Sequence, residues 1–224
     1  MAQQNYTNRM GKLANTNNTS IYTVPDQKMA IINSARIANT DASNATTITI
    51  QFLDSDDTAF TFYQEGSLAA GAEVYVFERP FFLDEKEEIK LEASASNDIE
   101  YIFSLVEVDQ GVNNKYLNKM YDHDTTDKIT LYTVPDDRTA LIMNFTSVNY
   151  SASTPTAAGV FANAGGTEFQ IDSGTMAAKT SYNHLVRTQV LQEKETIKFT
   201  AGTADQVNTL ISVLEMSKAG GSTA

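Results

Sequence analysis

The sequence contains no cysteine, and this absence removes several kinds of site at once. Without thiols there is no disulfide framework, no thiolate zinc site and no cysteine nucleophile. Tryptophan is also absent, and histidine occurs only twice. Sugar-binding surfaces use aromatic rings as stacking platforms. A carbohydrate-binding adsorption module would have to be built on the ten tyrosines, and it is kept as an alternative.

Long apolar runs are missing as well. Residues 1–20 lack the apolar core of a signal peptide, and no stretch approaches the roughly 20 apolar residues of a membrane helix. We therefore expect a protein that is made and kept in a cytoplasm, or released from it by lysis.

Basic residues are scarce relative to acidic ones. Sixteen Lys and Arg stand against 28 Asp and Glu, which gives a net charge of −12. Nucleic-acid binding depends on cations that displace counterions from phosphates, and anionic membranes repel acidic surfaces. We expect neither nucleic acid nor membrane as a partner. The charge suits a protein surface that must stay soluble.

The sequence repeats itself. Residues 22–26 (Tyr-Thr-Val-Pro-Asp) recur at 132–136, an offset of 110 (132 minus 22). The segment 83–90 matches 191–198, and 104–108 matches 212–216, both at an offset of 108. Three collinear matches indicate an internal duplication. We predict two domains, residues 1–112 and 113–224, with the boundary near the polar stretch 111–114.

The match extends to a short leader upstream of each copy. The leader residues Tyr6, Asn8, Arg9 and Met10 recur as Tyr116, Asn118, Lys119 and Met120. We expect a linker of about a dozen residues after each leader. The leader then either covers an edge strand of its own domain or reaches a neighbouring subunit as an assembly arm. Tyrosine and methionine suit an interface pocket, and the basic residue suits an acidic neighbour.

Within each copy the apolar residues alternate with polar ones, as in residues 47–52 and 197–199, and turn clusters lie between the alternating runs. No helical stripe persists over 12 residues. Seven or eight short strands in about 110 residues are typical of a β-sandwich, jelly-roll-like or immunoglobulin-like. The fold class is therefore all-β, with residues 13–112 and 123–218 forming two similar sandwiches.

Candidate chemical sites are few. The acids Asp122, Asp124 and Asp127 flank His123 and could hold a hard cation or zinc, but a solvated acidic linker explains them better. Residues 54–58 open like a calcium loop, yet Ala59 stands where the sharp turn requires glycine, which favours a turn between strands. The repeated acids of 85–88 and 193–195 flank lysines and are expected to form surface ion pairs; they are Glu85, Glu87, Glu193 and Glu195.

Enzyme motifs are lacking. There is no Gly-x-Ser-x-Gly, no glycine-rich phosphate loop, and residues 164–166 are typical of a hairpin tip. A pair of glycosidase carboxylates stays possible, since such acids need only meet in space. We expect no catalytic residue, no metal and no cofactor.

The run Ile/Leu-Tyr-Thr-Val-Pro at 21–25 and 131–135, with Ala-Ile/Leu-Ile at 30–32 and 140–142, resembles a theme of tailed-bacteriophage virion proteins. Residues 69–73 and the shared ending of 83–93 and 191–201 resemble it too. Residues 26–27 and 136–137 depart from it, because that family has an Ala-Gly turn there. The resemblance implies a structural role in the particle.

The function expected from these observations is that of a non-enzymatic virion protein that decorates or cements the outside of a phage capsid. A tail, neck or fibre-base component is the alternative. The negative charge favours the exterior, because a lumenal protein of this charge would face DNA of the same sign. Expected partners are the major capsid protein or tail proteins, together with further copies of this chain in a homo-oligomer.

Overall fold

The structure is a computed structural model that describes residues 4–77, 79–109 and 114–218. All eighteen elements of this part of the chain are β-strands, and every strand pair is antiparallel. Over the same residues there is no helix with the length and apolar character needed to cross a membrane. The all-β fold class expected from the alternation is confirmed.

The first half of the chain forms two sheets. Its strands are β1 (Gln4–Lys12), β2 (Thr19–Thr23), β3 (Lys28–Asn39), β4 (Thr46–Leu53), β5 (Ala59–Leu68), β6 (Glu73–Tyr75), β7 (Phe81–Leu83), β8 (Glu88–Ala93) and β9 (Ile99–Asp109). One sheet has the order β1-β9-β3-β6, with β7 also paired to β3, and the other has the order β2-β8-β4-β5. Successive strands mostly alternate between the sheets, which is the jelly-roll pattern of two Greek keys.

The second half has the same strand order. Its strands are β10 (Asn114–Asp122), β11 (Ile129–Thr133), β12 (Arg138–Asn149), β13 (Thr156–Ala162), β14 (Glu168–Thr175), β15 (Ser181–Asn183), β16 (Gln189–Leu191), β17 (Thr196–Ala201) and β18 (Val207–Ser217). They form the sheets β10-β18-β12-β15, with β16 paired to β12, and β11-β17-β13-β14. Even the irregularities agree: β3 shifts register between Ile32 and Ser34, and β12 shifts between Ile142 and Asn144.

Each half encloses its own apolar core between its two sheets. In the first half Ile32 and Phe103 from one sheet meet Ile50 and Leu91 from the other, all essentially inaccessible to solvent. Phe145 and Phe199 hold the same relation in the second half. The apolar residues of the alternating segments therefore lie in the core, because side chains on a strand point alternately to the core and to solvent.

The repeated motifs lie next to each other in space. Val24 of the Tyr-Thr-Val-Pro-Asp segment exchanges backbone hydrogen bonds with the turn before β8, at 3.0 Å to the Glu87 carbonyl and 3.1 Å from the Lys86 amide. Val134 does the same in the second half. Gln27 and Asp137 have φ angles of 61° and 60°, in the left-handed region where the resembled family has glycine. The turn therefore keeps its backbone shape without the glycine.

The leaders correct one expectation. We expected the sandwiches to begin at residues 13 and 123, but residues 4–12 and 114–122 are themselves the strands β1 and β10. Each pairs along its whole length with the last strand of its own half. Residues that alternate along a segment between one face and the other are typical of a strand, and the leader residues alternate in that way. The connection to the next strand is thus shorter than expected. Most of the expected boundary, 111–114, lies outside the described residues.

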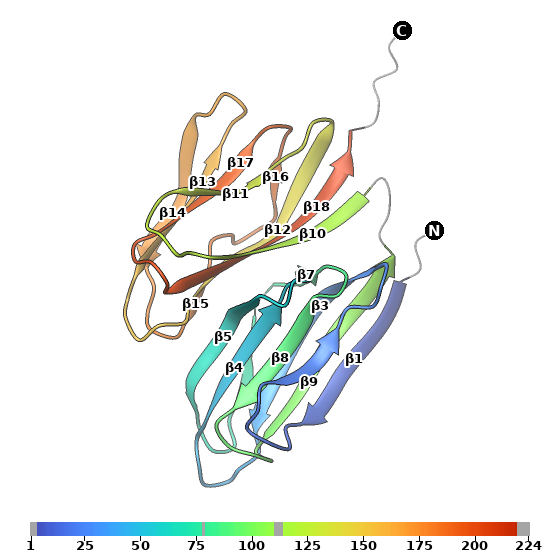
Figure 1. The fold of residues 1–224 in the computed structure, drawn as a ribbon, viewed down its shortest axis with the longest axis vertical. Coiled ribbons are helices and arrows are strands. Elements are labelled where there is room, and N and C mark those ends of the chain that lie inside the picture. The colour runs from blue at the N-terminus through green and yellow to red at the C-terminus, as the bar shows by residue number, and fades with distance from the viewer. Residues whose placement is uncertain (1–3, 78, 110–113, 219–224) are drawn as a thin grey trace.

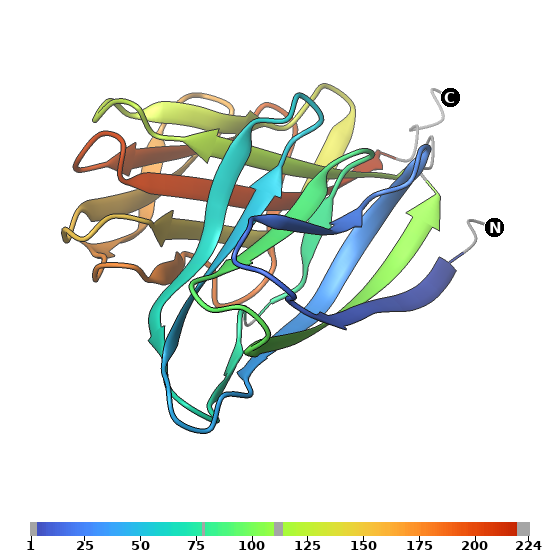
Figure 2. The same cartoon turned by 60° about the horizontal axis from the view of Figure 1, so that its bottom comes forward.

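The two sandwiches pack directly against each other (Figures 1 and 2). The outward face of the sheet β10-β18-β12 lies on β5 and β7 of the first half. Residues Val148 and Leu210 of the second half join the core cluster of the first, so the two halves share buried apolar surface.

Candidate assembly surface

The leader tyrosines, asparagines and methionines lie on the sheet faces that point away from their own cores. We use "N-terminal outer face" for the face that carries Tyr6, Asn8, Met10, Arg36 and Ile102 on β1, β9 and β3. The "C-terminal outer face" carries Tyr116, Asn118, Met120, Leu210 and Leu214 on β10 and β18. The registers agree, because Met10 lies opposite Ile102 just as Met120 lies opposite Leu210.

The C-terminal outer face is covered by the first sandwich. We call the covering part the "N-terminal rim", residues 60–64 on β5 and 79–87 around β7. Tyr116 meets Phe82 of this rim edge to face, with ring centroids 5.2 Å apart at 88°. Around them Met29, Val106 and Val108 form a buried cluster against which Leu214 also packs. Aromatic pairs of this geometry add to the stability that burial provides.

Asn118 is the polar centre of this contact and is only 4% exposed. Its side-chain amide donates to Glu87 Oε2 at 2.9 Å, and its backbone N–H donates to Asp84 Oδ2 at 3.2 Å. Burial raises the pKa of Glu87 to about 8, against the lowering effect of the Asn118 bond and with a further increase from the nearby Asp84. Glu87 was expected on the surface, and that expectation is wrong, because the second sandwich covers it.

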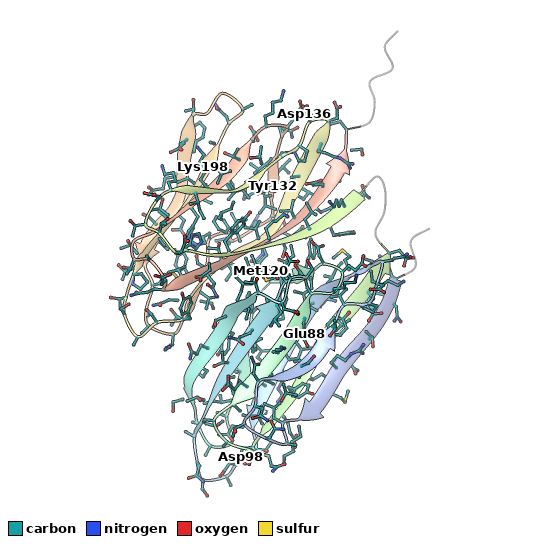
Figure 3. All side chains as sticks on the ribbon, viewed as in Figure 1. Glu88, Asp98, Met120, Tyr132, Asp136 and Lys198 are labelled. Carbon is teal, nitrogen blue, oxygen red and sulfur yellow. The ribbon has the colours of Figure 1, made fainter. Side chains whose placement is uncertain are left out.

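Met120 fills the other end of the contact. It packs against the core of the first sandwich, and a small gap beside it is lined by Phe60 and Phe62 of β5. Figure 3 shows Met120 at the junction of the two halves. Nearby, the Asn208 amide donates to the Thr61 carbonyl at 3.2 Å, so the apolar contact is framed by polar bonds.

Arg79 ties the rim to the second sandwich. Its guanidinium donates to the Met143 carbonyl at 3.1 Å, to the Leu185 carbonyl at 3.1 Å and to Thr188 Oγ1 at 3.3 Å. The planar fork of arginine suits several fixed acceptors. The backbone N–H of Phe82 adds a bond to Ser212 Oγ at 2.9 Å. The halves are therefore joined by directed bonds as well as by apolar packing.

The end of the N-terminal outer face around Tyr6, Met10 and Ile102 presents the same kinds of residue without a cover, whereas its other end, at Met29, Val106 and Val108, is buried against the second sandwich. Tyr6 is 74% exposed, Met10 61% and Ile102 36%. A groove of about 580 Å³ runs beside Met10 and Ile102, and Arg36 and Glu100 also line it. Tyr6 and Asn8 thus occupy the positions that match Tyr116 and Asn118. Only Tyr116 and Asn118 are in contact with another domain.

The basic leader residues behave differently. The Arg9 guanidinium lies 5.0 Å from the centre of the Tyr22 ring and 3.7 Å from Glu107 Oε1, so it packs on its own sandwich. Lys119 is exposed, beside Asp54 and the rim residue Glu85. Within this chain, then, Arg9 stabilises its own domain, and tyrosine, asparagine and methionine are the leader residues that can form contacts between domains.

Both histidines are buried, which corrects the expectation of a solvated linker around His123. Its Nε2 lies 2.9 Å from Thr209 Oγ1, and its ring packs on Phe199. His184 pairs with Ser147 and lies 3.5 Å from Asp172. Burial lowers the pKa of each histidine to about 4. Among the described residues no three His, Asp or Glu side chains gather as a metal site.

No family model and no curated protein matches the chain. Solved structures with some likeness include a protein of the Sulfolobus turreted icosahedral virus (14% identity, TM-score 0.34, 96% of this chain and 61% of that one). Others are the PBSX exported protein XepA (12%, 0.27, 96% and 86%) and a pilus protein of Bacillus endospore appendages (12%, 0.32, 46% and 86%). The chain spans less than two-thirds of the Sulfolobus virus protein. Likeness at TM-scores this low carries no information about function.

Proposed function

We propose that this chain is a non-enzymatic structural protein of a bacteriophage particle, attached to the outside of the capsid as a decorating or cementing protein. We also infer that its two sandwiches arose by tandem duplication. One observation carries the proposal. The leader residues that bind a neighbouring domain in the second half are presented on an open face in the first half.

The chemistry of this open face fits protein contact. Tyrosine and methionine are enriched at the centres of protein interfaces, and single exposed residues of this kind need no explanation, but a group of them on one face does. Tyr6, Met10 and Ile102 lie on adjacent strands in matched register, so they form one group. A face of this composition binds a protein surface rather than a small substrate.

The net charge supports the exterior of the particle. A chain of charge −12 next to packaged DNA would be repelled by it, whereas the same charge on the outside keeps particles apart in solution. The proposed partners are the major capsid protein and further copies of the chain, and neither nucleic acid nor membrane. Location on the tail, neck or fibre base is the competing outcome.

The test is binding to particles that lack the protein. The variant Tyr6→Ser with Met10→Ser should lose most binding, because it removes the apolar side chains of the open face. The control Thr47→Ser changes an exposed residue on β4, in the other sheet, and should bind normally. Equal binding of both variants would contradict the assignment of this face as an assembly surface of the particle.

A further inference from the structure

Among the residues that the structure describes, the large exposed apolar side chains other than Tyr75 fall into two groups. One is the N-terminal outer face described above. The other lies at the far end of the molecule and comprises Phe169 at 56% exposure, Val186 at 93% and Val190 at 54%. We call residues 168–173 and 186–195, on β14, β16 and the following turn, the "C-terminal rim". Apolar groups gathered at two separate places suggest two contact surfaces.

The C-terminal rim is the counterpart of the N-terminal rim. Val190 lies opposite Leu141 on β12, as Phe82 lies opposite Ile31 on β3. Phe169 likewise lies opposite Phe161, as Phe60 lies opposite Phe52. In the first half these positions are covered, with Phe82 at 2% exposure and Phe60 at 8%. In the second half the same positions are bare.

We infer that the N-terminal outer face of one copy binds the C-terminal rim of a second copy, and so repeats between chains the contact that joins the two halves within a chain. This inference rests on the assembly role proposed above and names the partner as a second copy of this chain. Each chain contains two outer faces and two rims, one of each in either half. One pair is used internally. The other pair, Tyr6 with Met10 against Val190 with Phe169, is exposed, although Val106 beside Tyr6 is already buried in the internal contact.

The polar parts of the contact are also in place. In the first half the Glu87 carboxylate accepts a hydrogen bond from the Asp84 backbone N–H at 2.8 Å as well as the bond from Asn118. In the second half Glu195 accepts the Gln192 backbone N–H at 2.8 Å, in the same turn. The acceptor for an asparagine is thus already oriented, and Asn8 is the residue that the register places there.

Two further hydrogen-bond donors of the N-terminal rim, the Arg79 side chain and the Phe82 backbone N–H, have counterparts in the C-terminal rim. Arg187 occupies the position of Arg79, three residues before Val190 as Arg79 is three before Phe82, and it is exposed. Ser104 lies opposite Asn8 as Ser212 lies opposite Asn118, so it can accept the edge N–H of Val190 as Ser212 accepts that of Phe82. An apolar patch with matching directed bonds specifies one register of docking.

The contact is heterologous, because a face binds a rim and not another face. Heterologous contacts continue from copy to copy and give a ring if the rotation closes or a filament if it does not. A face-to-face dimer would leave both C-terminal rims bare, which provides the distinction that an experiment can use.

The test uses two full-length variants that each block one surface, Tyr6→Glu on the outer face and Val190→Glu on the rim. Their association is measured by analytical ultracentrifugation, alone and mixed in equal amounts. A carboxylate buried without a partner should raise the Kd of the contact by about 30-fold or more. Thr47→Glu adds the same charge to the exposed side of β4 and is the control.

The wild type and the control should form head-to-tail oligomers. Each blocking variant alone should be monomeric, and the mixture should form heterodimers that grow no further, because one intact face and one intact rim remain. Oligomers of Val190→Glu alone, or a wild type that stays monomeric up to about 1 mM, would overturn the inference. A monomeric wild type that still binds particles would leave the proposed function standing, whereas oligomers that never bind particles would count against that function alone.

Discussion

Glu87 gives the contact between the sandwiches a pH dependence that can be worked out in advance. Its carboxylate lies under the second sandwich, and burial raises its pKa from 4.5 to about 8. A raised carboxyl pKa means that the folded state holds the proton more tightly than the unfolded chain. The stabilisation that Glu87 contributes is therefore fully present below pH 4.5 and is lost as the pH rises through 8.

The magnitude follows from the linkage relation, in which each unit of pKa difference corresponds to about 1.4 kcal/mol. Between pH 6.5 and 9 each histidine contributes only about 0.4 kcal/mol, of opposite sign, because its ordinary pKa is 6.5 and its folded pKa is lower; this part is common to the wild type and to Glu87→Gln. Over this window the wild type should lose about 2 kcal/mol of unfolding free energy through Glu87. The variant Glu87→Gln has no proton to lose, and it should lose far less.

The assay is urea unfolding of the full chain at half-unit pH steps. Glu195→Gln is the matched control, since Glu195 makes the same turn bond without a second sandwich above it. We expect that control to follow the wild-type profile. Parallel profiles for wild type and Glu87→Gln would refute the claim that Glu87 is desolvated by the contact.

Other predictions concern the two halves as internal controls for each other. Tyr116→Ala should cost about 2 kcal/mol in urea unfolding, because it removes the ring contact with the rim, whereas Tyr6→Ala should change stability by less than about 0.5 kcal/mol. Arg79→Lys should cost about 1–3 kcal/mol in the same assay, because an ammonium group cannot satisfy all three acceptors. The pKa of His123 and His184 is lowered to about 4, so stability should fall as the pH drops from 6.5 toward 4, by at most about 3 kcal/mol per histidine. Replacing them as His123→Leu and His184→Val should remove that loss in acid unfolding monitored by circular dichroism, and an unchanged acid profile would contradict their burial as neutral rings.

The sequence is sufficient to predict the strands and the repeat, because period-two alternation and collinear motifs are local signals. Residues 47–52 alternate and form most of β4, and the aspartates at 54–57 form the turn after it. The leaders carry the same alternation in Tyr-x-Asn-x-Met. That signal was available for predicting β1 and β10 as strands.

The burial of Glu87 could not be predicted in this way. Its motif is the same as that around Glu195, and only the docking of the second sandwich distinguishes the two. For the histidines a signal did exist. The repeat places His123 at the position of Leu13 and His184 at that of Val76, both apolar and buried. Position within the repeat was a better guide to burial than the acidic neighbours of His123.

The central claim is that the chain is a structural component on the outside of a phage capsid, and cryo-electron microscopy of the intact particle tests it most directly. The account predicts density for the two stacked sandwiches on the outer surface of the shell, with Tyr6 and Met10 buried against a neighbouring protein. Particles that lack the chain, or that carry it inside the shell or on the tail, would contradict the account.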